Sequence, residues 1–270
     1  MFIKQALYKI LGVRKYLIVV SQMFFFSYSM GWLKKNRTFD CHYFIKKLIK
    51  KGDHVIDIGA NLGYYSRLFA VLTGNEGKVY CVEPVSLFRK VLKINTSGYK
   101  NVSIVPFALG DEDNKEIMMG IPKSNKYLRH GLTRVLDQDE AEPFEFTFKE
   151  KMFTPETLFG DIERCDYIKC DVEGYEIHII PQLEFLIKEF YPILQIEIET
   201  VNRRMICNFL TTLTYKIYIL KDEMLFAITD NLDEVEGDLF FVPENKMKLV
   251  KPYLADYIIP DGSGQIEITK

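Results

Sequence analysis

At 270 residues the chain is long enough to bury a substantial core, and its composition, 48% hydrophobic and 27% charged, is that of a globular protein. A formal net charge of −2 argues against a protein that binds nucleic acid or an anionic membrane through its overall charge. The five cysteines are odd in number and form no C-x-x-C pair, so neither a disulfide framework nor a zinc cluster is predicted, and a reducing, cytoplasmic location is expected.

The first 36 residues differ from the rest of the chain. Apolar residues recur at helical spacing between Phe2 and Leu11, with lysines among them, and residues 16–32 are almost continuously apolar. Polar interruptions such as Gln22 weaken the case for a spanning helix, and no small-residue cleavage site of a signal peptide follows. Two interpretations stay open: a helical extension packed on the main domain, or an element for peripheral membrane contact or self-association.

From residue 37 to residue 270 strand-like and helix-like segments alternate, which predicts one α/β domain with a doubly wound, mostly parallel, seven-stranded sheet. The expected strands cover residues 54–58, 79–82, 102–106, 166–170, 193–198, 216–220 and 239–242. The expected helices cover residues 41–50, 64–72, 87–95 and 203–213.

An insert at about residues 110–153 interrupts this alternation. Its alternating Phe144, Phe146 and Phe148 predict extended pairing within the insert. Because the insert is longer than ordinary α/β connections, it is the best place to look for contacts with a substrate.

The most informative motif is the run Val-Ile-Asp-Ile-Gly-Ala-Asn-Leu-Gly at residues 55–63. A β-branched run ends near Asp57, a turn begins at Gly59, and an apolar helix-like segment follows, which is how a buried strand presents a small ligand to the amino end of a helix. Twenty residues past Gly63 a second strand-like run ends in Glu83, where an acid can bind the hydroxyls of a ribose. Together these features predict a nucleoside cofactor.

The spacing of the glycines indicates which cofactor. A dinucleotide fingerprint, G-x-G-x-x-G, would need glycines where this chain has Asn61 and Tyr64, so a pyrophosphate would meet side chains there. The pattern present, D-x-G-x-x-x-G, suits S-adenosylmethionine, which has an amino-acid tail and no phosphate. A nicotinamide-dependent oxidoreductase is the weaker alternative, and a cofactor-binding module without catalysis, tethered by its amino-terminal segment, is another.

With these motifs in hand, the chain resembles the FkbM family of class I S-adenosylmethionine-dependent methyltransferases. The resemblance rests on residues 55–63, 79–84 and 101–111, and above all on an I-K-x-D-x-E-G-x-E pattern at residues 168–176. It covers roughly residues 40–243 and implies methyl transfer to an oxygen, commonly a hydroxyl of a sugar or another small molecule. It further implies that Glu83 holds the ribose, that Ala108 and Leu109 lie near the adenine, and that the methionine end is lined by Asp57, Gly59, Asn61 and Gly63.

Three residues are candidates for the general base that an alcohol acceptor needs. Asp171 and Glu173 follow the strand at residues 166–170, and His130 lies in the insert and has the side chain best matched to neutral pH. Asp171, Glu173, Glu197 and Glu199 could also offer oxygen ligands to magnesium, but no metal site is assigned. Because the chain lacks a basic strip interleaved with aromatic residues, no nucleic-acid partner is expected. The resemblance implies a small-molecule acceptor such as a sugar or glycan, and the apolar amino-terminal segment would suit a lipid-linked sugar.

Overall fold

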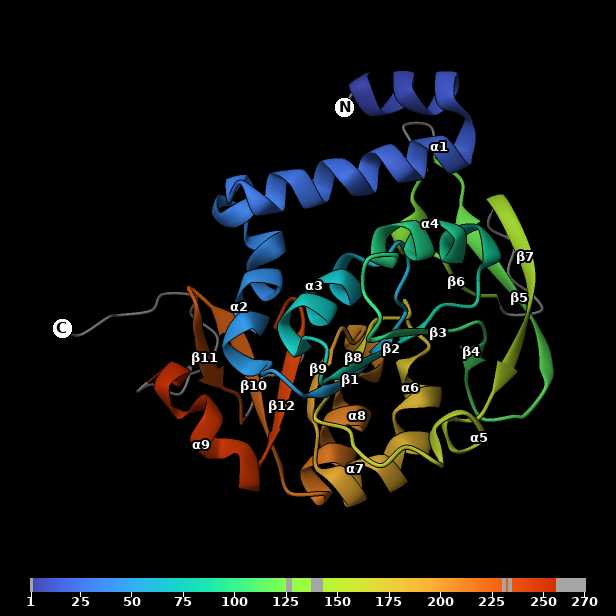
Figure 1. The fold of residues 1–270 in the computed structure, drawn as a ribbon. Coiled ribbons are helices and arrows are strands. Elements are labelled where there is room, and N and C mark those ends of the chain that lie inside the picture. The colour runs from blue at the N-terminus through green and yellow to red at the C-terminus, as the bar shows by residue number, and fades with distance from the viewer. Residues whose placement is uncertain (1, 125–127, 137–142, 230–231, 233–234, 256–270) are drawn as a thin grey trace.

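The computed structural model describes residues 2–124, 128–136, 143–229, 232 and 235–255. Within them the main sheet has eight strands in the order β11-β10-β12-β9-β8-β1-β2-β3 (Figure 1). The strands are β1 (His54–Ile58), β2 (Lys78–Val82), β3 (Val102–Val105), β8 (Tyr167–Cys170), β9 (Ile193–Ile196), β10 (Tyr215–Lys221), β11 (Met224–Ala227) and β12 (Leu239–Pro243).

The topology confirms the prediction of a doubly wound, mostly parallel sheet. Strand β1 pairs in parallel with both β2 and β8, so the chain winds outward from the centre of the sheet in one direction and then in the other. Such a switch point is where open α/β sheets bind their ligands, outside the carboxyl ends of the strands. Strand β12 is antiparallel to both of its neighbours, β9 and β10.

The sheet has one strand more than the seven predicted. The additional strand, β11, forms an antiparallel hairpin with β10, in which Lys221 pairs with Met224 across a two-residue turn. Both turn residues, Asp222 and Glu223, have positive φ, at 49° and 64°. Two-residue hairpin turns with positive φ usually contain a glycine. This turn contains none, so the sequence did not indicate a hairpin here.

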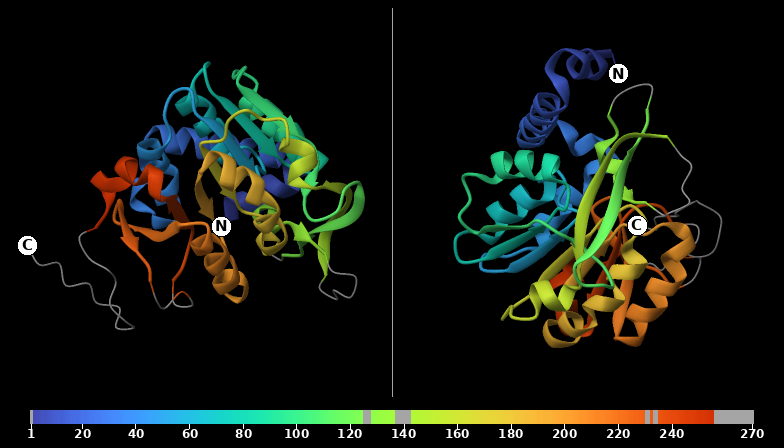
Figure 2. Two further views of the ribbon diagram at one scale, coloured as in Figure 1. Left: turned by 90° about the horizontal axis from the view of Figure 1, so that it is seen from below. Right: turned by 90° about the vertical axis from the view of Figure 1, so that its right-hand side faces the viewer.

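Helices cover both faces of the main sheet (Figures 1 and 2). The cluster on one face takes in Val55 of β1 together with helices α2 (Asp40–Leu48), α3 (Tyr64–Thr73) and α9 (Met247–Val250). The cluster on the other face takes in Ile56 together with α5 (Pro155–Phe159), α6 (Glu176–Ile179), α7 (Glu184–Phe190) and α8 (Thr200–Thr212). Neighbouring residues of one strand therefore point into different cores, as a buried parallel strand requires.

The insert forms a second, smaller sheet in the order β4-β7-β5-β6, from β4 (Ala108–Leu109), β5 (Lys115–Pro122), β6 (Arg134–Val135) and β7 (Phe144–Phe153). The predicted extended pairing is present, since Phe146 and Phe148 of β7 lie opposite Ile121 and Met119 of β5. This sheet packs on helix α4 (Ser86–Thr96) through Phe88. Residues 125–127 and 137–142 of the insert, and residues 256–270 of the predicted main domain, lie outside the described residues.

The amino-terminal segment is helix α1 (Phe2–Ser29), which crosses the molecule above α3 and α4 (Figure 1). The helix is kinked at Gly12, where φ is 69° and ψ is 163°. Tyr16 and Leu17 are fully buried against the insert and α4. Among the described residues, Ile10–Ser29 is the one helical stretch long and apolar enough to cross a membrane by length and composition, with a mean hydropathy of 1.4 and 22% of its apolar window buried.

Candidate functional site

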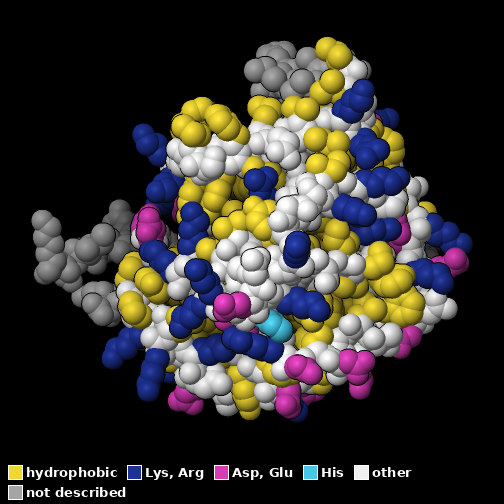
Figure 3. Space-filling view, viewed as in Figure 1, with side chains coloured by type: hydrophobic (Ala, Val, Ile, Leu, Met, Phe, Trp, Pro, Cys, Tyr) yellow, Lys and Arg dark blue, Asp and Glu magenta, His cyan; other side chains and the backbone are white. Residues whose placement is uncertain are grey.

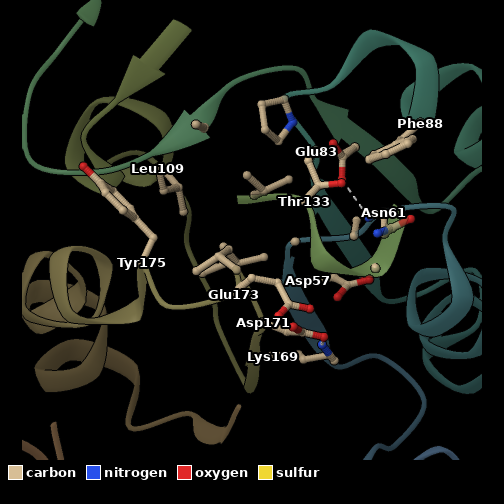
Figure 4. A pocket seen from close by; sticks show the side chains of 18 of the residues that line it. Asp57, Asn61, Glu83, Phe88, Leu109, Thr133, Lys169, Asp171, Glu173 and Tyr175 are labelled. Carbon is tan, nitrogen blue, oxygen red and sulfur yellow. Dashed lines mark hydrogen bonds and ion pairs between the residues drawn. The ribbon is translucent and has the colours of Figure 1, made fainter. Parts of the chain in front are cut away.

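A pocket opens at the carboxyl ends of β1, β2 and β8, and residues of the insert close it from the opposite side (Figure 4). Of the residues predicted from the sequence, those that line it are Asp57, Gly59, Asn61, Glu83, Ala108, Leu109, His130, Asp171 and Glu173. The structure thus brings together both groups of predicted residues, those for the cofactor and those for catalysis, but the role of each stays a prediction.

The turn after β1 lies directly against the end of β8. Gly59 has a φ of 79°, and a Cβ atom built on it would lie 1.8 Å from the carbonyl oxygen of Asp171. The amides of Gly59 and Ala60 both donate to the carbonyl of Val82, at 3.1 and 2.9 Å, which fixes the turn on the neighbouring strand. Only glycine fits at position 59, and its bare backbone forms part of the pocket wall.

Glu83 is held by two backbone amides. Val85 N donates to its Oε1 and Asn61 N donates to its Oε2, each at 2.8 Å. Burial raises the pKa of Glu83 to about 7, against the lowering effect of the two amides. Each carboxylate oxygen keeps a second lone pair, so the group can still accept hydrogen bonds from a pair of hydroxyls in the pocket.

Asp57 is buried, and only one of its two carboxylate oxygens has a hydrogen-bond partner. Ser66 Oγ donates to its Oδ2 at 2.5 Å, whereas Oδ1 has no hydrogen-bond partner in the structure. Burial raises the pKa of Asp57 to about 6, although Lys169 acts in the opposite direction. A buried carboxylate oxygen without a partner is costly, and a positively charged group at this end of the pocket would remove that cost. Together with the bare backbone of Gly59 and the acceptor oxygens of Glu83, this orphaned oxygen fits S-adenosylmethionine.

Gly63 is the predicted cofactor residue that does not line the pocket. It precedes α3 with a φ of 86°, and a Cβ atom there would lie 2.6 Å from Leu92 Cδ1 in α4. The structure therefore accounts for this glycine by the close approach of α3 to α4.

Asn61 connects the glycine turn to the insert. Its Nδ2 donates to the carbonyl of His130 at 3.1 Å, and its Oδ1 lies 3.1 Å from His130 Nδ1. His130 begins the short 3-10 helix η3 (His130–Leu132), so this pair of contacts holds the insert over the pocket.

Lys169, which sequence reasoning missed, lies at the opposite end of the pocket from Glu83 (Figure 4). The side chain is 3% exposed, and its Nζ lies 2.8 Å from Asp171 Oδ2 and 4.7 Å from the ring centre of Tyr65. Burial lowers its pKa, but the carboxylates of Asp171, Asp57 and Asp238 outweigh burial and raise it, so the lysine stays charged. A lysine within the apolar run of β8 was the signal that could have found it, because lysines are rarely buried without a partner.

The chain turns sharply directly after β8. Glu173 and Gly174 have φ values of 55° and 100°, so Asp171 and Glu173 do not continue the strand. Glu176 caps this turn by accepting from Val172 N at 2.9 Å and Gly174 N at 3.1 Å. Glu176 therefore holds the turn that leads into α6.

Glu173 lies among other carboxylates. Burial, followed by the charges of Asp171 and Glu197, raises the pKa of Glu173 to about 8. Burial and Asp171 likewise raise the pKa of Glu197 to about 7. Within the described residues, no group of three or more His, Cys, Asp and Glu side chains is arranged to hold a metal ion.

His42 of α2 is another pocket residue that sequence reasoning missed, and unlike Lys169 it has no signal in the sequence. Its ring stacks on Tyr65, with centroids 4.0 Å apart and planes 27° apart. Burial, helped by Lys169, lowers its pKa to about 3, so the imidazole is neutral, and its Nδ1 has no hydrogen-bond partner in the structure. The contact joins α2 to α3 in space and could not be read from their separate sequences.

Comparison with solved structures and curated proteins gives weak individual likenesses. An FkbM methyltransferase from Methylobacillus flagellatus is 15% identical with a TM-score of 0.45, over 70% of this chain and 43% of that one. Aeropyrum pernix fibrillarin with natively bound S-adenosyl-L-methionine is 13% identical with a TM-score of 0.43, over 72% of this chain and 68% of that one. A protein-L-isoaspartate O-methyltransferase from Ignicoccus hospitalis is 34% identical over 59 residues, so the match spans 21% of this chain and 28% of that relative's length.

The family comparison is broader. The profile described as "Methyltransferase FkbM domain" matches residues 57–217, more than half of the chain. The prediction of S-adenosylmethionine as the cofactor is confirmed with it, and neither the oxidoreductase nor the non-catalytic module gains support. The match runs from Asp57 of β1 through the turn after β8 into β10, and because it covers more than half of the chain, the chain belongs to the FkbM methyltransferase family.

Proposed function

We propose that this protein transfers the methyl group of S-adenosylmethionine to a hydroxyl oxygen of a sugar or another small molecule. The observation that carries the proposal is the position of Glu173 at the pocket wall, partly buried near Asp171 and Glu197, whose charges add to burial in raising its pKa. An alcohol has a very high pKa, so its oxygen needs a group that takes the proton as the new bond forms. A carboxylate with a pKa near neutrality performs that task better than one of ordinary acidity.

The side chains around Glu173 support this choice of base. The carboxylate of Asp171 is already engaged, because its Oδ2 accepts from Lys169 Nζ at 2.8 Å. The ring of His130 contacts Asn61, so its first task is to hold the insert in place. Glu173 has carboxylate neighbours instead, and a proton on it relieves their repulsion.

The other pocket residues would bind the cofactor and orient the acceptor. When bound, S-adenosylmethionine supplies an electrophilic methyl group, and Glu83, Asp57 and Gly59 would hold its ribose and amino-acid ends. Lys169 keeps the charge of Asp171 balanced next to the acceptor. The remaining task of the protein is to align the acceptor oxygen and exclude water, which the insert does by covering the pocket.

The lining also favours a small, uncharged acceptor over nucleic acid. Among the described residues that line the pocket, Lys169 is the one lysine or arginine, and Asp171 already neutralises it. A phosphate backbone would approach the carboxylates of Asp171 and Glu173 instead of basic side chains. The lining is otherwise largely apolar and aromatic, as small-molecule sites are.

The proposal is tested by a screen for turnover. The purified full chain is incubated with S-adenosylmethionine and a panel of sugars, glycans and lipid-linked sugars, and formation of S-adenosylhomocysteine and methylated product is followed. With an accepted substrate, Glu173→Gln should lower kcat by about 10²- to 10⁴-fold, the range for loss of a general base, without changing the affinity for S-adenosylmethionine.

The control is Glu156→Gln, which removes an exposed carboxylate of α5 far from the pocket lining and should keep full activity. If Glu173→Gln kept full activity and His130→Asn lost it, His130 and not Glu173 would be the general base. Turnover of RNA but of no small molecule in the panel would refute the proposed acceptor class.

A further inference from the structure

Helix α1 and the 3-10 helix η1 (Trp32–Lys35) carry large apolar side chains on their outer surface. Met23, Phe26 and Met30 are 52%, 57% and 54% exposed, and Trp32 is 63% exposed. Met23, Phe26 and Met30 follow one another at spacings of three and four residues, so they share one face of the helix. Trp32 meets Phe26 edge to face at 5.5 Å, which joins the four residues into one apolar strip.

The opposite face of α1 is fixed to the domain. Tyr16, Leu17 and Phe25 are buried, and Phe24 packs on Tyr64 with ring centres 4.6 Å apart. Gln22 Nε2 also donates to Asn95 Oδ1 of α4 at 2.6 Å. If α1 were to cross a bilayer, it would have to leave these contacts and expose the apolar surface beneath it. Helix α1 therefore lies along the surface of the molecule (Figure 1), and the exposed side chains of the apolar strip are on its outer side.

The charged side chains of this segment are all positive. The first 39 residues contain seven lysines and arginines and no aspartate or glutamate, although the whole chain has a net charge of −2. Arg14 and Lys15 are exposed before the apolar strip, and Lys34 and Lys35 are exposed after it. In Figure 3 the upper part of the molecule, over α1, shows mainly apolar, Lys and Arg side chains.

We propose that this apolar strip docks on the surface of an anionic lipid bilayer. The side chains of Met23, Phe26, Met30 and Trp32 enter the boundary between headgroups and acyl chains, and the lysines and arginines at both ends contact the anionic headgroups. A second copy of the chain is the poorer occupant, because it would bring two equally basic segments together.

Docking in this way would place the methyltransferase pocket close to the bilayer. Tyr64, on which Phe24 packs, is itself a pocket-lining residue, so a single layer of side chains separates α1 from the pocket.

The test is co-sedimentation of the full chain with vesicles of phosphatidylcholine alone and of an equal mixture of phosphatidylcholine and phosphatidylglycerol. We expect binding to the mixed vesicles, weakened by high salt, and little binding to phosphatidylcholine alone. Changing Phe26 and Trp32 together to serine should lower the partition coefficient about tenfold or more, because two aromatic rings no longer enter the bilayer.

The matched control changes Val201 and Met205 together to serine. These residues of α8 are 82% and 63% exposed and lie outside the proposed surface, so that variant should bind like the wild type. Because all four side chains are exposed, both variants should keep the thermal stability of the wild type.

Three results would overturn the proposal. One is equal sedimentation of the wild type and of the Phe26 and Trp32 variant with mixed vesicles. Another is a protein that does not bind vesicles but forms a concentration-dependent dimer in light scattering, when the Phe26 and Trp32 substitutions abolish that dimer. The third is a vesicle-bound protein that only detergent releases, which would mean that α1 spans the bilayer after all.

Discussion

The two ends of the pocket surround a carboxylate with different partners (Figure 4). At the glycine turn each oxygen of Glu83 accepts a hydrogen bond from a backbone amide. At the turn after β8, the charged groups that most affect the pKa of Glu173 are the carboxylates of Asp171 and Glu197. Burial raises the pKa at both ends, to about 7 for Glu83 and to about 8 for Glu173.

Glu83 is buried and Glu173 is partly buried, so the two ends differ most clearly in the partners of the carboxylate. Backbone amides orient Glu83 before any ligand arrives, which suits a group that recognises hydroxyls. Carboxylate neighbours raise the free energy of ionised Glu173, which suits a group that takes up a proton. The Glu83 end is ordered before a ligand binds, whereas at the other end the charges of Asp171 and Glu197 oppose ionisation of Glu173.

The largest effect should follow a change of the backbone that both ends share. Gly59→Ala would place a Cβ atom 1.8 Å from the Asp171 carbonyl, so β8 and the turn would have to separate. We expect a loss of about 4 kcal/mol or more in the free energy of unfolding, measured in urea, and no detectable binding of S-adenosylmethionine. Gly52→Ala is the control: its φ of 83° is similar but nothing lies within 4 Å of the new Cβ, so about 1 kcal/mol should be lost and binding kept.

The next largest effect should follow loss of Lys169, the one lysine or arginine among the described residues that line the pocket, at the end formed by Asp171 and Glu173 (the acidic end). Lys169→Met leaves Asp171 and Asp57 without their compensating charge in a buried place, and should cost about 3 kcal/mol of unfolding free energy at neutral pH. Lys188→Met removes an exposed lysine 2.6 Å from Glu184, and should cost well under 1 kcal/mol, as exposed pairs do. Equal losses in the two variants would show that Lys169 does not balance the acidic end.

Glu83 tests the end that is ordered for binding. Glu83→Ala removes the acceptor for two hydroxyls and leaves the amides of Asn61 and Val85 unpaired, so we expect about 100-fold weaker binding of S-adenosylmethionine in calorimetric titration. Glu83→Gln keeps the shape and one acceptor oxygen and should lose less. If the alanine variant bound as tightly as the wild type, the cofactor would not be held at this carboxylate.

Most of the fold could be predicted from the sequence, because strands such as His54–Ile58 are short apolar runs closed by a turn signal. The cofactor end could be predicted for a similar reason, since its residues lie within two short segments of fixed spacing. The roles given to the individual site residues, and the cytoplasmic location, stay predictions.

The acidic end was harder to predict because three-dimensional contacts create it. Lys169 matters through its distance to Asp171 and Asp57, and His42 through its stacking on Tyr65. The stacking of His42 has no periodic or compositional signature, and a lysine within the apolar run of β8 signals a buried charge without showing its partners. The hairpin of β11 was missed for a local reason, since Asp222 and Glu223 adopt positive φ without a glycine.

The pH dependence of stability measures the repulsion at the acidic end. Glu173 has a folded-state pKa of about 8, above its ordinary value, so the folded state binds the proton more tightly than the unfolded state. Its contribution is therefore fully present at low pH and is lost as the pH rises through about 8, and Tm should fall between about pH 5 and pH 8. Glu173→Gln cannot ionise, so it should melt about 3 °C higher than the wild type near pH 8 and show a flatter profile.

A Tm that rises over this interval in the wild type, or falls as steeply in the glutamine variant, would contradict the assignment. The same substitution is expected to abolish most turnover, so a gain in stability with a loss of activity would identify Glu173 as a strained functional group and not a structural one.

The smallest effect is expected where the cofactor end meets the insert. Asn61→Ala removes the two contacts to His130, at 3.1 Å each, but leaves the backbone amide that donates to Glu83. The insert should open more often over the pocket, which raises the Kd for S-adenosylmethionine about three- to tenfold and speeds amide hydrogen exchange around His130. Asn114→Ala is a matched control, because Asn114 also has a positive φ, 58°, and a side-chain contact, to Lys151 at 2.7 Å, but lies at the surface. Since both alanines meet the same backbone strain, a difference between them in Kd and exchange isolates the Asn61 contacts. Equal behaviour would mean that the insert stays closed without them, and that the glycine turn orders the cofactor end on its own.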